Sequence, residues 1–196
     1  IAESGIVAVK GLGGYHLVCD AANEAALAAL RQRKHRPGKA FAVMVASVEE
    51  ARALCEVNDA EARQLTSPAR PIVLLRKRSD AAFAKGLADN LPELGVMLPT
   101  TPVQHLLLHE CGGMLVMTSG NIHDEPIVID EEAAFSQLAG VADAFLVNNR
   151  EIVGRYDDSV IRILDGGAAG DIVQFIRRAR GYAPLPVSAP CPEGAS

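Results

Sequence analysis

Aromatic residues are scarce in this sequence: Phe, Tyr and Trp make up only 4% of its 196 residues, and Trp is absent. Proteins that bind single-stranded nucleic acid stack the bases on aromatic side chains, so this composition argues against that class. Every apolar run has fewer than ten residues, too few to cross a membrane as a helix. The chain shows no signal-peptide pattern and begins at Ile1, so we expect a piece cut from a longer polypeptide.

Excess positive charge is also missing, because the net charge is −5 and the pI is about 5.5. Broad electrostatic binding to nucleic acid or to an anionic membrane is therefore not expected. The four cysteines are far apart and form no C-x-x-C pair, which predicts free thiols rather than disulfides or a zinc site. We accordingly expect a cytoplasmic protein without a membrane partner.

The sequence does contain enough apolar residues for one ordinary domain, since 49% of the chain is apolar and 22% is charged. We predict one domain over residues 1–184 and a linker-like tail over 185–196 that leads to a following domain.

The order of apolar runs and capping signals predicts an α/β fold with a mixed sheet, because strands and helices alternate irregularly and a hairpin signal comes late. The expected strands cover residues 6–9, 15–19, 40–46, 71–78, 95–98, 114–117, 144–147, 160–164 and 172–176. The expected helices cover residues 22–33, 48–57, 59–66, 102–109 and 131–138. Either Asp20 or Asn23 can cap the first helix, and residues 79–94 are expected to form a loop with one short helical piece.

A cluster of cations follows the first expected helix and consists of Arg33, Lys34, Arg36 and Lys39. Arginine presents a planar fork of donors that matches phosphate, and lysine adds a point charge. A rigid Pro-Gly turn inside the cluster aims these charges, so they are candidates for holding a triphosphate and stabilising a departing pyrophosphate. The alternative is a solvated helix C-terminus, where cations are favoured in any case.

A second candidate is the turn Thr118-Ser119-Gly120-Asn121, which follows an expected strand. Ligands of open α/β sheets bind at strand ends, and a glycine lets backbone N–H groups point at an anion. The alternative is an ordinary Asx or Ser turn. We predict that this turn and the cation cluster meet over one nucleotide, although neither a Rossmann fingerprint nor a Walker A motif is present.

Three further groups are weaker candidates. His105 lies near the start of an expected helix and either contacts a nucleotide or is an ordinary surface histidine, and its spacing to His109 is not that of a zinc site. The carboxylates of Asp157 and Asp158 either help to hold Mg²⁺ or cap a turn. Near the end of the chain, Arg177, Arg178 and Arg180 either reach an anion or line a solvated edge.

Several segments, in order along nearly the whole chain, carry a resemblance to a known family. They are residues 6–17 (IVAVKGLGGYHL), 33–39 (RKHRPGK), 98–105 (LPTTPVQH), 117–121 (MTSGN), 149–150 (NR), 157–160 (DDSV) and 178–184 (RARGYAP). Together they resemble the YrdC-like family, and within it the YrdC-like domain of the HypF carbamoyltransferases of nickel-iron hydrogenase maturation.

The resemblance implies a twisted, mixed, open sheet flanked by helices, with a basic concave face. It implies that ATP, assisted by Mg²⁺, reacts with a carbamoyl donor (carbamoyl phosphate or carbamate) to give carbamoyl-adenylate and pyrophosphate. It further implies that adjacent domains of the full-length enzyme pass the carbamoyl group to the C-terminal cysteine of a HypE-type acceptor protein, where it becomes a cyanide ligand.

The family marks its nucleotide site with a Lys-x-Arg pair and a Ser-x-Asn pair, which fall on Lys34 and Arg36 and on Ser119 and Asn121 of this sequence. The resemblance makes Lys34 and Arg36 the candidate catalytic residues. The full candidate nucleotide-binding set is Lys34, Arg36, Lys39, His105, Thr118, Ser119, Asn121, Ser159 and Arg180, with no protein metal site.

Two alternatives remain open. One is threonylcarbamoyl-adenylate synthesis, but relatives of that kind carry a Pro-Thr-x-Thr stretch where this chain has glycines over residues 10–14. The other is a double-stranded RNA-binding module that uses the basic concave face, against which the acidic net charge argues.

Overall fold

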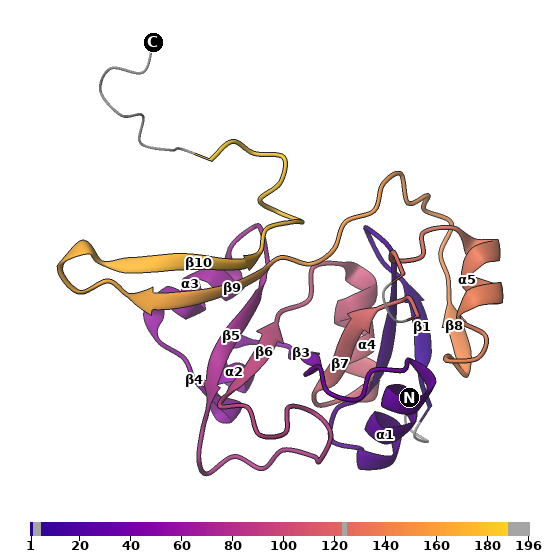
Figure 1. Ribbon diagram of the computed structural model, residues 1–196, viewed down its shortest axis with the longest axis horizontal. Coiled ribbons are helices and arrows are strands. Elements are labelled where there is room, and N and C mark those ends of the chain that lie inside the picture. Colours follow the sequence, from indigo (N-terminus) through magenta and orange to yellow (C-terminus); the bar gives the residue numbers. More distant parts are fainter. Residues whose placement is uncertain (2–4, 123–124, 188–196) are drawn as a thin grey trace.

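The structure is a computed structural model that describes residue 1 and residues 5–122 and 125–187. The strands are β1 (Val7–Lys10), β2 (Tyr15–Asp20), β3 (Ala42–Met44), β4 (Cys55–Glu56), β5 (Ile72–Lys77), β6 (Glu93–Met97), β7 (Leu115–Ser119), β8 (Ala144–Leu146), β9 (Val160–Asp165) and β10 (Asp171–Arg177). Within the described residues they form one ten-stranded sheet in the order β10-β9-β5-β6-β3-β7-β2-β1-β8, with β4 added to β5 (Figure 1). Both parallel and antiparallel pairs occur, so the predicted mixed, open α/β sheet is confirmed.

Five α-helices are described: α1 (Glu24–Arg33), α2 (Val48–Leu54), α3 (Asp59–Thr66), α4 (Pro102–Cys111) and α5 (Glu131–Gln137). Each helix begins after a side chain that accepts a hydrogen bond from a backbone N–H of the first turn. These caps are Asn23, Ser47, Asn58, Thr101 and Asp130. The first helix is therefore capped by Asn23 and not by Asp20.

Two local predictions are wrong. The second helix ends at Leu54 instead of continuing to residue 57, because Cys55 and Glu56 pair with Lys77 and Arg76 of β5 as strand β4. Residues 79–92 contain no helical piece, and β6 begins at Glu93. At the end of α2, pairing with β5 satisfies the backbone in place of a further helical turn, whereas residues 79–92 form turns and bends.

Side-chain alternation along β3 and β7 separates two apolar cores. Val43, Val45 and Val116 pack in the larger core with α1, α2, α3 and α5. Met44 and Met117 point to the opposite face and pack with α4. One face of the sheet is therefore covered by four helices, whereas α4 is the only described helix that packs against the other face.

The remaining predictions concern cysteines, membrane spans and the tail. Cys19, Cys55 and Cys111 are free thiols, as predicted, and Cys191 lies outside the described residues. In the described part of the chain, no helix has the length and apolarity needed to cross a membrane. Residues 188–196 of the predicted linker also lie outside the described residues.

Candidate functional site

A row of four residues on neighbouring strands forms the bottom of a hollow on the α4 side of the sheet. Leu74, Gly95, Ala42 and Met117 stand opposite one another in the register of β5, β6, β3 and β7. The two central residues are the smallest of the row, so the sheet surface is depressed between larger neighbours. All four line a cavity of about 200 Å³, which we call the sheet cavity.

A second cavity of about 230 Å³, which we call the basic cavity, adjoins the sheet cavity. Arg36, Ser119, Asp157 and Arg177 line both cavities. These residues come from the segment after α1, the end of β7, the segment before β9 and the end of β10. Lys34, Arg36 and Lys39 of the cation cluster thus meet the turn after β7 at one place, as the sequence predicted. Arg33 does not, because it lines neither cavity and its Nη1 donates to Asp143 Oδ1 at 2.7 Å and to the Val141 oxygen at 3.0 Å.

Lys34 connects these two segments directly, because its ammonium group donates three hydrogen bonds to the turn after β7. The Nζ atom donates to the backbone oxygens of Ser119 and Asn121, both at 2.6 Å, and to Asn121 Oδ1 at 2.5 Å. Lys34 is only 2% exposed, and burial, followed by the nearby charge of Arg36, lowers the pKa of Lys34 to about 8. The lysine therefore fixes the turn and places a positive charge beside the basic cavity.

The turn after β7 is also held against β2. Gly120 donates its N–H to the Tyr15 backbone oxygen at 2.6 Å and accepts from the Val128 N–H at 2.9 Å. Within the turn, Ser119 Oγ donates to Asn121 Oδ1 at 2.8 Å. A Cβ atom on Gly120 would lie 2.6 Å from the Tyr15 oxygen, so this close approach requires glycine.

Arg36 is the cation best placed to bind a ligand, because part of its guanidinium has no partner in the protein. Its Nη2 donates to the Ala40 oxygen at 2.9 Å, and the guanidinium lies 5.5 Å from the centroid of the Phe41 ring. Nε is buried and has no hydrogen-bond partner among the described residues. Burial and the charges of Arg31 and Arg177 lower the pKa of Arg36. An acceptor brought to Nε would satisfy a donor that is costly to leave unpaired.

The basic cavity carries both signs of charge. Lys39 and Arg177, both exposed, add to its positive side, and Glu125 and Asp157 supply carboxylates. Across the described ranges, no group of three or more His, Cys, Asp or Glu could hold a metal ion. A magnesium ion carried by substrate phosphates needs only one or two carboxylates, and Glu125 and Asp157 fit that requirement.

A buried network borders the sheet cavity where the segment before β9 meets β2. Asp158 Oδ2 lies 3.3 Å from His16 Nε2, and Arg180 donates to Asp158 Oδ1 from Nε at 3.0 Å and from Nη2 at 2.7 Å. Burial alone would raise the pKa of Asp158, but His16 and Arg180 outweigh burial and hold that pKa well below its usual value. Both His16 and Asp158 line the sheet cavity.

The remaining predicted site residues are placed differently. Thr118 lines the sheet cavity. Ser159 is fully buried and lines neither cavity, because its Oγ donates to the Arg180 oxygen at 2.9 Å and accepts from the Ala179 N–H at 2.8 Å. Arg180 lines neither cavity, and His105 is exposed on α4 away from both. A direct nucleotide contact by Ser159, Arg180 or His105 stays a prediction.

Reasoning from the sequence missed much of the lining of the sheet cavity, including the polar residue His16 and the aromatic residue Phe41. Alternation along β2 puts His16 on the same face as Val18, which packs with α4, so the facing of His16 was predictable. What the sequence does not reveal is that β2 and the segment before β9 lie side by side there.

The comparisons with known proteins agree with this geometry. The model of the Sua5/YciO/YrdC family, described as "Telomere recombination", matches residues 1–179. The chain belongs to this family, and its fold is that of a YrdC-like domain. Within the family it matches HypF carbamoyltransferases: it is 52% identical to Carbamoyltransferase HypF2 of Cupriavidus necator over 195 residues, which cover 91% of this chain and 24% of that protein.

Two solved structures are similar over almost the whole chain. A full-length HypF in a phosphate- and nucleotide-bound form is 51% identical with a TM-score of 0.89, and the match covers 94% of this chain and 28% of that one. HypF of T. kodakarensis is 45% identical with a TM-score of 0.89, and the match covers 96% of this chain and 24% of that one. The chain therefore spans about a quarter of the length of the HypF proteins that it matches.

Proposed function

We propose that this chain is the domain of a HypF-type carbamoyltransferase that forms carbamoyl-adenylate from ATP and a carbamoyl donor, in hydrogenase maturation. The observation that carries the proposal is the convergence of the Lys-x-Arg and Ser-x-Asn pairs on one cavity, where Arg36 presents a buried, unpaired Nε. The 52% identity to a carbamoyltransferase and the nucleotide bound by a similar HypF support it.

The reaction proceeds by displacement at the α-phosphorus of ATP. An oxygen of carbamate, released from carbamoyl phosphate by hydrolysis, attacks the α-phosphorus and forms a new O–P bond. The bond from the α-phosphorus to the oxygen bridging the β-phosphate breaks, and pyrophosphate leaves with that electron pair. The protein contributes by positioning the reactants and by offsetting the charge on the leaving group.

Three groups of the basic cavity serve this step. Arg36 and Lys39 face the phosphates, and the Arg36 guanidinium, which lines the basic cavity, donates to the leaving pyrophosphate. Lys34 supplies a fixed positive charge while it holds Ser119 and Asn121 in place. Glu125 and Asp157 would hold Mg²⁺ together with the phosphates, where the ion offsets negative charge.

The product belongs to a longer reaction sequence. Adjacent domains of the full-length enzyme pass the carbamoyl group from the adenylate to the C-terminal cysteine of a HypE-type acceptor protein. The partners of this domain are therefore ATP, the carbamoyl donor and those adjacent domains. We place this work in the cytoplasm, without a nucleic acid or membrane partner.

The test is carbamate-dependent exchange between ATP and labelled pyrophosphate in the wild-type chain and in Arg36→Ala. Removing one preorganised charged donor costs about 10²–10³-fold in rate, so we expect exchange to fall by that factor while the fold persists. The matched control is Arg76→Ala, because Arg76 is exposed, pairs with Glu56 at 3.7 Å and lines neither cavity. Unchanged exchange in Arg36→Ala would remove Arg36 from the site.

Adding threonine separates the proposal from threonylcarbamoyl-adenylate synthesis. The glycine-rich turn between β1 and β2 is tightly packed, since a Cβ on Gly13 would lie 2.5 Å from the Tyr156 oxygen and one on Gly14 2.4 Å from Ile127 Cδ1. The turn therefore has no room for threonine side chains that could build an amino-acid pocket. We expect an adenylate whose mass contains a carbamoyl group and no threonine.

A further inference from the structure

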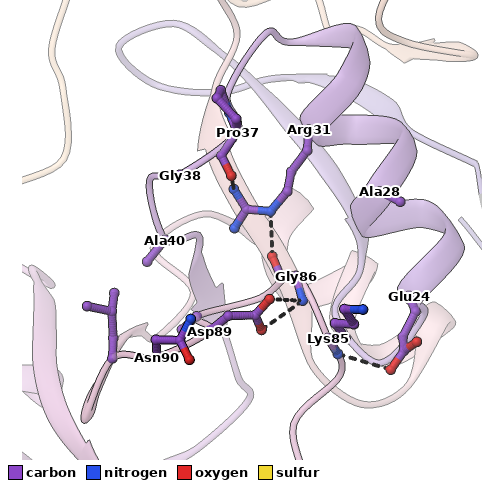
Figure 2. A pocket seen from close by; sticks show the side chains of 12 residues that line it. Glu24, Ala28, Arg31, Pro37, Gly38, Ala40, Lys85, Gly86, Asp89 and Asn90 are labelled. Carbon is purple, nitrogen blue, oxygen red and sulfur yellow. Dashed lines mark hydrogen bonds between the residues drawn. The ribbon is translucent and has the colours of Figure 1, made fainter.

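The loop that carries Arg36 and Lys39 is held mainly by one arginine that lies behind it. Arg31 Nη1 donates to the backbone oxygens of Arg36 at 2.9 Å, Lys39 at 3.0 Å and Pro37 at 3.3 Å. Figure 2 shows this guanidinium between α1 and the loop. One side chain thus bonds three carbonyl groups of residues 36–40.

The same guanidinium ties the loop to the segment before β6. Arg31 Nε donates to the Gly86 oxygen at 2.7 Å (Figure 2). Its Nη2 donates to the Leu87 oxygen at 3.5 Å. The group also lies 4.5 Å from the centroid of the Phe41 ring. Gly86 is itself fixed, because its N–H donates to both carboxylate oxygens of Asp89, at 2.9 and 3.0 Å. The arginine therefore bridges two loops that are distant in sequence.

Apart from Arg31, the loop is held by Arg36, whose Nη2 donates to the Ala40 oxygen and whose N–H donates to the Arg31 oxygen, both at 2.9 Å. The N–H groups of Gly38, Lys39 and Ala40 donate to no other group in the described residues, and Pro37 has no N–H. The residues from Pro37 to Lys39 are exposed. A loop with few internal hydrogen bonds opens easily unless another element fixes its carbonyl groups.

The cavity behind the loop carries no sign of a ligand of its own. It has a volume of about 550 Å³ and is lined by Arg31, Glu24, Lys85 and Asp89, among others (Figure 2). The carboxylates of Glu24 and Asp89 bond to the protein itself, since Glu24 accepts from the Lys85 backbone N–H at 3.1 Å and Asp89 accepts from the Gly86 N–H at 2.9 Å. The loop from Pro37 to Ala40 thus separates this cavity from the basic cavity.

We propose that Arg31 is a positioning residue that sets the phosphate-binding geometry of Arg36 and Lys39 without touching the nucleotide. This inference rests on the proposed function, because it assigns the basic cavity to the phosphates of ATP. Lysine cannot replace Arg31, since an ammonium group has three donors around one nitrogen and cannot span carbonyl groups of two loops. Arg31 therefore affects phosphate binding from the side of the loop that faces away from the basic cavity.

The experiment compares Arg31→Lys with the wild-type chain by two measurements. Amide hydrogen exchange should become faster in residues 36–41 and 86–87 and stay unchanged in the sheet. Calorimetry should show that the Kd for ATP rises about tenfold, a coupling size typical of residues in one contact network. The control is Arg162→Lys, which makes the same exchange in an arginine that bonds Glu93 through two nitrogens outside both cavities, and it should leave the Kd unchanged.

A double-variant series separates positioning from general loss of structure. In a background that already carries Arg36→Ala and Lys39→Ala, Arg31→Lys should weaken ATP binding less than about twofold, because no charges are left to position. An equal loss of ATP affinity in both backgrounds, or an unchanged rate of amide hydrogen exchange in residues 36–41, would overturn the inference.

If Arg31→Lys fails to fold, Asp89→Asn is the second variant, because it loosens the turn at Gly86. It should speed amide hydrogen exchange and raise the Kd for ATP, both by less than Arg31→Lys. A wild-type chain that binds no ATP would instead refute the proposed function, and hydrogen exchange would still report whether Arg31 holds the loop.

Discussion

Lys34 is a buried lysine whose three hydrogen-bond donors are all used by the protein. An ammonium group has three N–H bonds, so all three contacts to Ser119 and Asn121 require the protonated form. Burial works against that form and lowers the pKa of Lys34 to about 8, well under its ordinary value of 10.5. The protonation of this residue is therefore sensitive to anything that changes the charge of the basic cavity.

We predict that ATP binding takes up protons at about pH 8–9. Bound phosphates favour the ammonium form and raise the pKa of Lys34, so part of the neutral population becomes protonated on binding. Calorimetry at pH 8.5 in two buffers of different ionisation enthalpy would measure this uptake. Lys39→Gln, which removes an exposed lysine of the same cavity, should weaken binding yet keep the buffer dependence.

The effects of pH on binding and on stability have opposite signs. Between pH 8 and 10.5 the unfolded chain binds more protons at Lys34 than the folded chain, so the contribution of this residue to stability rises across that window. ATP affinity falls across the same window because the fixed charge is lost. Heats at pH 8.5 that are identical in both buffers would contradict the assignment of Lys34 to the phosphate site.

Asp158 is the second buried charge on which the site depends, and we predict that Asp158→Asn destabilises the fold by about 3–5 kcal/mol. The substitution keeps the shape but leaves the guanidinium of Arg180 buried without its counter-charge. Urea unfolding would measure the loss. Because the pKa of Asp158 is lowered by the fold, its contribution is present above the ordinary value of 3.8 and disappears as the pH falls through the lower folded value.

The control for Asp158→Asn is Asp171→Asn. Asp171 pairs with Arg63 at 3.4 Å, and both side chains are about half or more exposed. An exposed pair contributes about 0–1 kcal/mol, so this variant should unfold almost like the wild type. Similar losses in the two variants would mean that the network of Asp158, His16 and Arg180 is not what stabilises this region.

Among the structural elements, the turn after β7 is the one whose backbone position matters most for the site. We predict that Gly120→Ala lowers the free energy of unfolding by about 1–3 kcal/mol and weakens ATP binding, because the new Cβ would meet the Tyr15 oxygen at 2.6 Å. Urea unfolding and ATP calorimetry on the same variant would check both effects.

The contrasting glycine is Gly38, in the loop after α1. No atom lies within 4 Å of a Cβ built there, and its backbone is outside the left-handed region. Gly38→Ala should therefore leave the stability unchanged or raise it by up to about 1 kcal/mol, since alanine restricts the unfolded chain. A large loss in Gly38→Ala, or none in Gly120→Ala, would contradict this view of the two turns.

Helix starts could be predicted from the sequence, whereas one helix end could not. The caps at Asn58 and Thr101 each bond a backbone N–H only three residues away, so the signal is local. The end of α2 depends on Cys55 and Glu56, which pair with residues of β5 far along the chain. The local sequence pattern contains no signal of such a pairing. The pattern therefore predicted a helix at Cys55 and Glu56, which form strand β4.

For the molecule as a whole, the centre of the site was predictable and its border was not. The sequence analysis predicted that the segments of Lys34 and Asn121 meet, and in the structure Lys34 Nζ donates a hydrogen bond to Asn121 Oδ1. By contrast, Ser159 carries the same hydroxyl group as a ligand-binding serine, but its Oγ bonds the backbone of the segment at Arg180. Residue type alone cannot distinguish a serine that binds a ligand from one that bonds the backbone. The difference depends on which strand end packs against which loop.

The charge of the whole molecule decides between a nucleotide site and a duplex RNA surface. Lys34, Arg36, Lys39 and Arg177 are the four cations of the basic cavity, they face two carboxylates, and the chain carries a net charge of −5. A protein that makes 6–10 phosphate contacts loses about 10³–10⁵-fold in affinity between 50 and 200 mM salt. We predict that the Kd for ATP changes by less than about tenfold over that range, because one triphosphate engages few charges in a partly buried site.

Calorimetry with ATP and filter binding with a short RNA duplex, each over the same salt series, would measure the two dependences. The basic cavity is about 230 Å³ and the adjoining sheet cavity about 200 Å³, dimensions that suit a small molecule and not the side of a double helix. Duplex RNA should therefore bind more weakly than ATP at 200 mM salt and should not compete with it. If RNA binds more tightly there and displaces ATP, the cations serve a nucleic-acid surface, and the assignment of Arg36 to a leaving pyrophosphate is wrong.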